Sequence, residues 1–378
     1  MSAHSRLKVK TGRSVLTNEK EAAQELADAI SQPQMKAAIV FCSSRYDLDE
    51  LASELKKRFS CPLIGCTTAG EISSKGYQDG GITGASLSSP ELMVHSYTIS
   101  PLSQFTPSQG RELANAIRRE LSPPHKFERE TMFGLLLIDG LSMLEEQVIS
   151  ELYSQFEGIS IVGGSAGDDL RFKTTGVYSG GRFVSDAAVF TLVETTLPFL
   201  VFKTQHFQPT DTKMVITDAE PHRRLVAEIN AEPAAEEYAR MLGLDVDQLN
   251  STVFSEYPLM LKVGDEWYVR SIQRVNKDKS LTFYCAIEVG LVMTLAKGVD
   301  PVSNLKEKLE ELALRIPNPQ LLIGCDCILR KLEIVEKGIQ GEVAQLLKDL
   351  NFVGFSTYGE QFDSIHVNQT LACVAIGR

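Results

Sequence analysis

The chain has 378 residues, a formal net charge of −11 and 43% hydrophobic residues. This length favours two or three domain-sized units with substantial cores. The acidic balance, with no cluster of Lys or Arg to offset it, argues against binding to nucleic acid or to an anionic membrane surface. The sequence contains no run of about 18 uncharged apolar residues. Residues 1–8 lack the apolar core of a signal peptide and the seven cysteines are unevenly spaced, so we expect a cytoplasmic protein with reduced thiols.

The first part of the chain alternates between predicted helices and strands. Polar residues 1–18 form a strand or a loose arm, and an amphipathic helix follows over 19–30 with Thr17 or Asn18 as its cap. An apolar run over 37–42 predicts a strand that is covered on both faces, and Asp47 begins a second helix. Since another short apolar strand follows, this order predicts a parallel pair joined by a right-handed crossover.

The middle of the chain contains further short strands between helices. Two strand-like runs, over 82–87 and 92–99, are joined by Ser-Ser-Pro-Glu and predict a hairpin. Later elements are a helix over 110–121, a Pro/His loop over 122–125, a buried strand over 133–138, a helix over 145–156, and short β-branched and aromatic runs over 174–202.

The second half of the chain also combines predicted helices and strands, and its strands more often alternate apolar and polar residues. Its predicted elements are a helix after Pro233 that Gly243 ends, strands over 260–263, 267–275 and 281–286, a helix over 302–315, a buried strand over 320–325, a helix over 338–350 and a closing strand over 370–376. We therefore predict an α/β fold of two related α/β domains with mixed, mainly buried sheets. The domains are expected over 33–200 and 220–360.

One short phrase occurs three times, over 64–71, 162–168 and 353–360. Each copy has a β-branched residue, a glycine, small or hydroxyl residues, a second glycine and a carboxylate. Glycines permit positive φ and close backbone approach, and successive N–H groups in such turns bind anions. The phrases, including Gly163, Gly164 and Tyr358, are thus candidates for a ligand-binding edge. Alternatively, the glycines only let strands turn tightly beside each other. The acids Glu71, Asp168, Asp169 and Glu360 are expected to stabilise turns or orient a ligand.

Motifs for catalysis are not found in the sequence. No phosphate loop and no dinucleotide-binding glycine motif is present. The run Gly163 to Gly167 has the wrong spacing for a nucleophile elbow. Cys325-Asp326-Cys327 is too closely spaced for a zinc knuckle and no second cysteine pair follows, which leaves buried packing or a redox pair. We therefore expect a protein that is not an enzyme.

These residues together resemble the FIST family of sensory proteins, which have an N-terminal and a C-terminal FIST domain. The resemblance rests on the three glycine phrases, on Glu228-Ile229-Asn230 with Pro233 and Tyr238, and on Asn368-Gln369-Thr370, and it covers nearly the whole chain. It implies a protein that binds a small molecule and passes a signal to partner proteins.

Within this family the segment Lys203 to Phe207 looks like the NosP group of haem-binding nitric oxide sensors. That resemblance implies a haem b cofactor, nitric oxide as the signal, and a separate histidine kinase or cyclic-di-GMP enzyme, a diguanylate cyclase or phosphodiesterase, as the partner. A homodimer is left open. The other hypothesis is a haem-free FIST module that binds an amino-acid-like ligand through its glycine turns.

Haem iron takes one axial histidine in the simplest sensor of this kind, and six histidines compete for the role. His206 is the preferred ligand because it lies at the domain junction, where pockets often occur. Phe202 and Phe207, with Phe199, are expected to supply apolar walls. His95 and His366 are the reserve candidates, while His4, His125 and His222 lie in polar or turn-like segments. In the alternative, His206 only hydrogen-bonds within the protein.

Overall fold

A computed structural model describes residues 7–121 and 127–378 of the chain. Its residues form two compact units, of which unit 1 contains the described residues up to Lys203 together with Lys306–His366 and Leu371–Arg378. Unit 2 contains Thr204–Leu305 and Val367–Thr370. The predicted mixed α/β fold with mainly buried sheets is confirmed. His4 and His125 lie outside the described residues.

Unit 1 is built from one arrangement that occurs three times. Repeat 1 comprises β1 (Lys8–Ser14), α1 (Glu19–Ile30), β2 (Ala37–Ser43), α2 (Leu48–Arg58), β3 (Leu63–Thr68), β4 (Glu71–Ser73), β5 (Gly76–Gln78) and β6 (Ile82–Ser88). Asn18 caps α1 and Asp47 caps α2, as expected from the sequence. β2 and β3 are parallel, which confirms the predicted crossover pair. β6 pairs with both β2 and β1, so the repeat forms the order β1-β6-β2-β3.

Repeats 2 and 3 reproduce this order of strands. Repeat 2 comprises β7 (Leu92–Ile99), α3 (Pro107–Glu120), β8 (Met132–Ile138), α4 (Glu145–Gln155), β9 (Ser160–Ser165), β10 (Val177–Ser179), β11 (Arg182–Val184) and β12 (Ala188–Thr195). Repeat 3 comprises β13 (Phe199–Thr204), α7 (Pro301–Arg315), β22 (Leu321–Cys327), α8 (Ile328–Glu336), α9 (Gln340–Leu347), β23 (Phe352–Thr357), β24 (Glu360–Phe362), β25 (Ile365–Val367) and β26 (Leu371–Ile376). Their strand orders are β7-β12-β8-β9 and β13-β26-β22-β23.

Each repeat completes its sheet with the hairpin of another repeat. The hairpin β10-β11 of repeat 2 extends the sheet of repeat 1, β24-β25 of repeat 3 extends that of repeat 2, and β4-β5 of repeat 1 extends that of repeat 3. The result is three six-stranded sheets linked by a cyclic exchange of hairpins. Because every repeat receives a hairpin from one of the other repeats and gives its own hairpin to the remaining one, unit 1 is expected to fold as one cooperative body.

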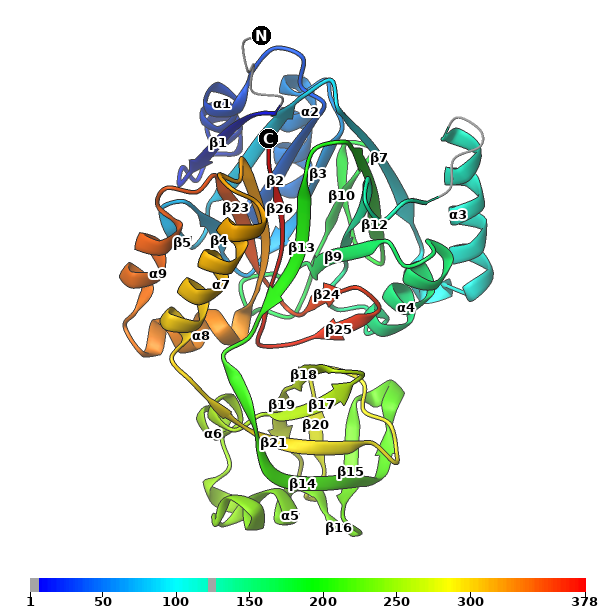
Figure 1. The fold of residues 1–378 in the computed structure, drawn as a ribbon, viewed down its shortest axis with the longest axis vertical. Coiled ribbons are helices and arrows are strands. Elements are labelled where there is room, and N and C mark those ends of the chain that lie inside the picture. The colour runs from blue at the N-terminus through cyan, green and yellow to red at the C-terminus, as the bar shows by residue number, and fades with distance from the viewer. Residues whose placement is uncertain (1–6, 122–126) are drawn as a thin grey trace. The chain divides into compact units, whose positions relative to one another are not determined.

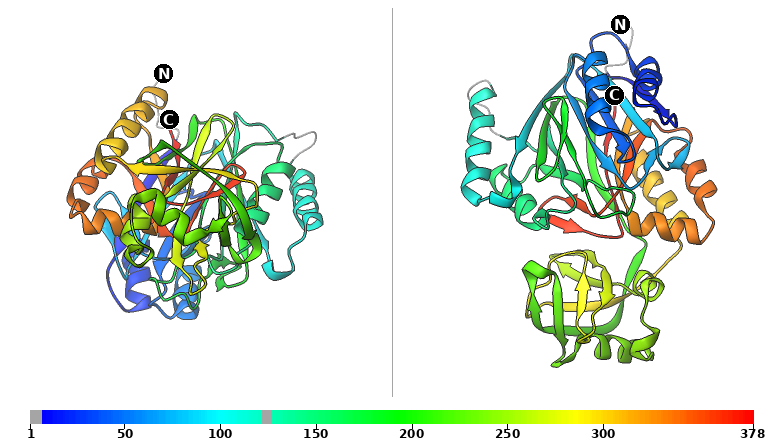
Figure 2. Two further views of the ribbon diagram at one scale, coloured as in Figure 1. Left: turned by 90° about the horizontal axis from the view of Figure 1, so that it is seen from below. Right: turned by 180° about the vertical axis from the view of Figure 1, so that it is seen from behind.

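The three sheets share a central hydrophobic core. It contains Phe41 of β2, Leu137 of β8 and Cys325 of β22, and the rings of Phe41 and Phe355 lie 4.5 Å apart. Helices cover the outer faces, with α1 and α2 on repeat 1, α3 and α4 on repeat 2, and α7 to α9 on repeat 3 (Figures 1 and 2). Buried strands with apolar runs and amphipathic helices fit this layering, since a strand between a core and a helix layer is covered on both faces. No helix of the described residues is long and apolar enough to cross a membrane.

Unit 2 interrupts repeat 3 between β13 and α7. It is an antiparallel sheet with two short helices, α5 (Ala234–Leu242) and α6 (Ser251–Glu256). Its strands are β14 (Phe207–Glu220), β15 (Leu225–Ile229), β16 (Glu232–Pro233), β17 (Leu259–Val263), β18 (Glu266–Arg270), β19 (Ile272–Val275), β20 (Leu281–Phe283) and β21 (Val292–Gly298). Met214, Tyr238 and Phe283 lie in its core.

The predicted hairpin over 82–99 is wrong. β6 lies in the sheet of repeat 1 between β1 and β2, whereas β7 begins repeat 2 and pairs with β12. The turn signal at Ser88 to Glu91 is real, but it joins two sheets instead of two paired strands. The two predicted domains, 33–200 and 220–360, are each continuous in the sequence. The compact units are not, because residues 306–366 return to unit 1.

Candidate functional site

The three glycine phrases meet in unit 1, where β3, β9 and β23 end. Backbone hydrogen bonds link them in a ring. The Gly167 N–H donates to the Thr67 carbonyl at 3.0 Å, the Ala69 N–H to the Ser356 carbonyl at 2.9 Å, and the Tyr358 N–H to the Ser165 carbonyl at 3.2 Å. Each repeat thus contacts the next through equivalent residues. The sequence motif that occurs three times therefore marks a single junction, which we call the glycine junction.

The first glycine of each phrase is required by close backbone approach. A Cβ atom would lie 2.1 Å from the Val40 carbonyl oxygen at Gly65, 1.9 Å from that of Leu136 at Gly163, and 2.4 Å from that of Gly324 at Gly354. None of these three glycines has positive φ, unlike Gly70 with φ of 128°. Tight strand packing therefore accounts for the first glycines, as the second of the two interpretations from the sequence proposes.

Asp168 fixes the backbone that leaves the second phrase. Its carboxylate accepts hydrogen bonds from the backbone N–H groups of Phe172 at 2.8 Å, Lys173 at 2.6 Å and Thr174 at 3.0 Å, and from the hydroxyl of Tyr358. Burial acts to raise the pKa of this carboxyl, but these hydrogen bonds outweigh it, so the pKa lies below its ordinary value. Asp168 is a turn-stabilising acid, as predicted.

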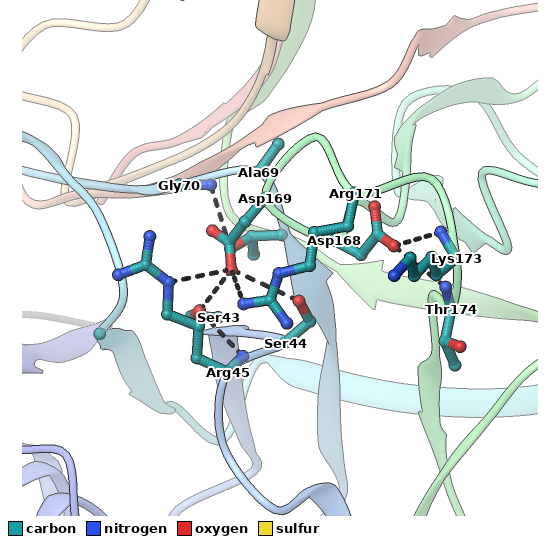
Figure 3. Close-up of polar contacts among 12 residues, drawn as sticks. Ser43, Ser44, Arg45, Ala69, Gly70, Asp168, Asp169, Arg171, Lys173 and Thr174 are labelled. Atoms are coloured by element: carbon teal, nitrogen blue, oxygen red, sulfur yellow. Dashed lines mark hydrogen bonds and ion pairs between the residues drawn. The ribbon is translucent and has the colours of Figure 1, made fainter.

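Asp169 brings together charged and hydroxyl groups from two repeats (Figure 3). Its Oδ2 accepts a hydrogen bond from the Ser43 hydroxyl at 2.7 Å. The same oxygen lies 3.7 Å from Nε of Arg45 and 3.6 Å from a guanidinium nitrogen of Arg171. Ser43 is the last residue of β2 and Arg45 follows it, so both lie at the carboxyl end of the strand, the edge at which open α/β sheets commonly bind ligands. Two arginines thus share one carboxylate, which leaves a local excess of positive charge.

Glu71 is almost fully buried beside this cluster. The Thr68 hydroxyl donates to its Oε1 at 2.6 Å and the Gly81 N–H to its Oε2 at 2.9 Å. Burial raises the pKa of Glu71 to about 8, although the two hydrogen bonds and Lys331 act in the opposite direction. Lys331, on α8, donates to the Ala69 carbonyl at 2.8 Å and to the Asp79 carboxylate.

A second polar group lies where the hairpin of repeat 3 joins β9. Gln361 on β24 is fully buried, and its amide nitrogen donates to the Ser165 hydroxyl at 3.0 Å and lies 3.3 Å from Nδ1 of His366. The amide oxygen of Gln361 has no hydrogen-bond partner within the described residues. Natural proteins rarely leave a buried acceptor unsatisfied, because this costs about 1–3 kcal/mol. The amide oxygen of Gln361 is therefore open to a hydrogen bond from a ligand or a water molecule.

The predicted site residues are distributed over both units. Gly163, Gly164 and Tyr358 lie at the glycine junction, where a Cβ atom on Gly164 would lie 2.7 Å from the Phe355 ring. Phe202 is a buried residue of unit 1. His206 and Phe207 belong to unit 2, where both are buried and their rings lie 4.3 Å apart.

The reserve histidines already have polar neighbours. His95 on β7 is partly exposed, and its Nε2 lies 3.0 Å from the Glu194 carboxylate. His366 on β25 is buried next to Gln361. Among the described residues, no group of three His, Cys, Asp or Glu side chains is arranged to hold a metal ion. Cys325 and Cys327 are both buried, and neither forms a disulfide.

Sequence reasoning missed Gln361, Ser43, Arg45 and Arg171. The longer connection after β9 becomes visible only once the short strands β4, β10 and β24 are located, so it was no signal in the sequence. No sequence signal pointed to Gln361 either. Its importance depends on the partner strand β9, which comes from another repeat.

Comparison with known proteins finds two family domains in the chain. The FIST N domain matches residues 36–232 and the FIST C domain matches residues 234–363. An uncharacterised protein of Methanocaldococcus jannaschii is 25% identical over 339 residues, which cover 87% of this chain. The chain spans 60% of the length of that relative. The chain belongs to the FIST family, and its FIST N and FIST C domains indicate a role in sensory signalling.

Proposed function

We propose that this protein is a sensory binding protein, not an enzyme, and that it recognises a small polar molecule in unit 1 through Gln361. The observation that carries this proposal is the unsatisfied amide oxygen of the fully buried Gln361. Its amide nitrogen is already oriented by Ser165 and His366. A side chain held in this way presents a fixed acceptor to a ligand, and a fixed acceptor needs little reorganisation on binding.

The ligand class follows from the chemistry of that acceptor. A buried carbonyl oxygen is best satisfied by an N–H donor, and a charged donor forms a hydrogen bond that is stronger than a neutral one. The ammonium group of an amino-acid-like molecule is such a donor. A molecule that binds one conformation of the protein more tightly than another shifts its equilibrium, and a separate histidine kinase or cyclic-di-GMP enzyme that distinguishes the conformations receives the signal.

Titration of the purified protein with the twenty amino acids tests this proposal. At least one amino acid is expected to raise the melting temperature and to give a saturable binding heat. Gln361→Leu keeps a similar volume but removes the acceptor, so it is expected to weaken binding at least tenfold. Gln24→Leu, at an exposed position on α1, is the matched control and should bind like the wild type. Absence of binding by all twenty, or equal binding by Gln361→Leu, would reject the proposal.

A second candidate is a haem-dependent nitric oxide sensor of the NosP type. The observation that favours it is the complete burial of His206 beside the Phe207 ring. An imidazole excluded from water and flanked by an aromatic ring suits an axial haem ligand. His206 is preferred to His95 because His206 is fully buried, whereas the His95 side chain is partly exposed. Bound haem b would supply an iron atom that coordinates nitric oxide.

The visible spectrum distinguishes the two candidates. Protein produced with a haem supply should show a Soret band that moves when nitric oxide is added to the reduced form. His206→Ala should lose haem while it stays folded, whereas His222→Ala, at an exposed position in a short 3-10 helix, should keep it. A colourless protein that takes up no haem removes this candidate. Unchanged haem content in His206→Ala would transfer the role to His95 or His366.

A further inference from the structure

The connection between β9 and β10 is longer than the fold requires. In repeats 1 and 3 two residues join the equivalent strands, β3 to β4 and β23 to β24. In repeat 2 the connection takes residues 166–176, which we call the 166–176 loop. Two residues are enough for the equivalent connections in repeats 1 and 3, so the additional residues of repeat 2 are not needed to complete the sheet. Extra length of this kind on a rigid scaffold commonly serves binding.

The backbone of the 166–176 loop is held in an unusual conformation. Asp169, Leu170 and Phe172 have φ of 55°, 62° and 50°. Left-handed backbone is disfavoured for residues with bulky side chains, and glycine is the ordinary choice for it. Such conformations persist only where surrounding contacts enforce them, and they concentrate at functional sites.

Two buried carboxylates enforce this conformation. Asp168 accepts hydrogen bonds from the backbone N–H groups of residues 172–174, of which Figure 3 shows those of Lys173 and Thr174. The Tyr358 hydroxyl also donates to Asp168 and holds it in place. Asp169 is fixed by Ser43 and by the two arginines, Arg45 and Arg171. The loop is therefore braced at its base by residues from all three repeats. A braced loop loses little conformational entropy when a partner binds it.

The braced loop presents apolar side chains to solvent. Leu170 is 41% exposed and Phe172 is 49% exposed. One face of Phe172 stacks on Tyr358, with ring centroids 4.7 Å apart and an interplanar angle of 18°. The stacking fixes the ring but leaves half of the residue uncovered. Exposed aromatic side chains of fixed orientation are frequent anchors of protein interfaces.

Three exposed basic side chains lie on this loop or contact its Asp169: Arg171 and Lys173 belong to the loop, and Arg45 pairs with Asp169. The side chains of Arg45 and Arg171 are 60% and 45% exposed, and Lys173 is also exposed. This local positive charge contrasts with the net charge of −11 of the chain. Basic side chains on the same loop as an apolar anchor are complementary to an apolar pocket edged by carboxylates.

We propose that the 166–176 loop docks a separate protein through Leu170 and Phe172, into an apolar pocket whose rim carries Asp and Glu side chains. A membrane fits less well, because the rest of this acidic chain is repelled by anionic lipids. A symmetric contact with a second copy fits less well too, because the basic side chains of the two loops would face each other. This inference rests on one part of the proposed function, namely that a sensor acts on a partner protein. It does not depend on which ligand the sensor binds.

Site-specific photo-crosslinking in the native host provides the first arm of the test. A benzoylphenylalanine placed at position 172 should form a covalent adduct with one protein. The same residue placed at position 314, where Leu314 is 84% exposed on α7, is the matched control and should not form that adduct. The identified protein is then purified and its affinity for the full chain is measured directly.

Variants of the full chain provide the second arm. Phe172→Asn and Leu170→Asn keep a residue that tolerates left-handed backbone but remove the apolar surface, so each should weaken binding at least tenfold. Arg171→Glu should weaken binding at low salt, and the wild-type affinity should fall as salt rises. Leu314→Asn should bind like the wild type. Unchanged melting temperatures would show that the variants are folded.

Several results would overturn the proposal. One is a position-172 adduct only with a second copy of this chain, and another is equal partner affinity for Phe172→Asn. Sedimentation with vesicles of phosphatidylethanolamine and phosphatidylglycerol that is lost in Phe172→Asn would assign the loop to a lipid surface instead. Absence of any adduct specific to position 172 would also reject it. Failure of amino-acid or haem binding would reject the proposed function and leave this test unaffected.

Discussion

The hydroxyl of Tyr358 donates a hydrogen bond to the carboxylate of Asp168, a residue 190 positions earlier in the chain. The contact joins the third glycine phrase to the second, and the Asp168 N–H donates back to the same hydroxyl oxygen at 3.2 Å. Asp168 in turn holds the backbone of residues 172–174. One hydroxyl thus connects two repeats and supports the loop that carries Phe172.

Removing this hydroxyl should destabilise the protein measurably. Tyr358→Phe keeps the ring that Phe172 stacks on but leaves a buried carboxylate with one donor fewer, so we expect a loss of about 1–3 kcal/mol in the free energy of unfolding. Chemical denaturation measures this change. Tyr153→Phe on α4 is the control, because its hydroxyl makes no hydrogen bond among the described contacts, and it should change stability by less than about 0.5 kcal/mol. Equal stability of both variants would contradict the assignment.

Replacing the first glycine of a phrase by alanine should severely destabilise the folded protein. In Gly163→Ala the new Cβ would lie 1.9 Å from the Leu136 carbonyl oxygen, so the two central strands of repeat 2 would have to separate. We expect a loss of more than about 3 kcal/mol, or failure to fold. Gly341→Ala on α9 meets open space and should be neutral or stabilising by up to about 1 kcal/mol. Thermal unfolding of the two variants provides the comparison.

Glu71 should make stability depend on pH. Its pKa is about 8 in the folded protein against an ordinary value of 4.5, so the folded state holds a proton that the unfolded state releases between these values. The contribution is fully present below about pH 4.5 and is lost as the pH rises through 8, by at most about 5 kcal/mol.

Glu71→Gln mimics the protonated side chain and should remove this dependence. Its amide oxygen can accept from Gly81 and its amide nitrogen can donate to the Thr68 hydroxyl. The variant should gain stability relative to the wild type between pH 5 and pH 8, as measured by urea denaturation at both values. A difference between the two proteins that does not change with pH would show that Glu71 is ionised in the folded state.

The buried ion pair between Asp326 on β22 and Arg330 on α8 gives another prediction. Nε of Arg330 lies 2.9 Å from Asp326, both side chains are almost fully buried, and Tyr77 also donates to that carboxylate. Arg330→Leu would leave the carboxylate without its cation, so we expect a loss of about 3–5 kcal/mol. Lys306→Leu, which removes one partner of an exposed pair with Glu310, should cost less than about 1 kcal/mol. Denaturation midpoints of both variants test the contrast, and equal losses would contradict it.

The local elements were predictable from the sequence because their signals are local. The apolar run of β2, the stripe of α1 and the caps Asn18 and Asp47 depend only on neighbouring residues. The same is true of the parallel β2-β3 pair, since a short helix between two buried strands leaves few connections. The family was also identifiable, because the glycine phrases are sequence motifs.

The sequence by itself determined the strands, the helices and the three glycine phrases, and only the tertiary structure decided which of them meet. Alternation and apolar runs show that a strand is buried, but they do not show which strand pairs with it. This is why the hairpin predicted over 82–99 was wrong. The exchange of β4-β5, β10-β11 and β24-β25 likewise depends on contacts between distant segments. The same limit applies to the site. Two contacts illustrate this limit, that of Asp168 with Tyr358 and that of Gln361 with Ser165. Both form because the hairpin of one repeat pairs with the sheet of another, and hydrogen bonds between such distant residues leave no periodic pattern in the sequence.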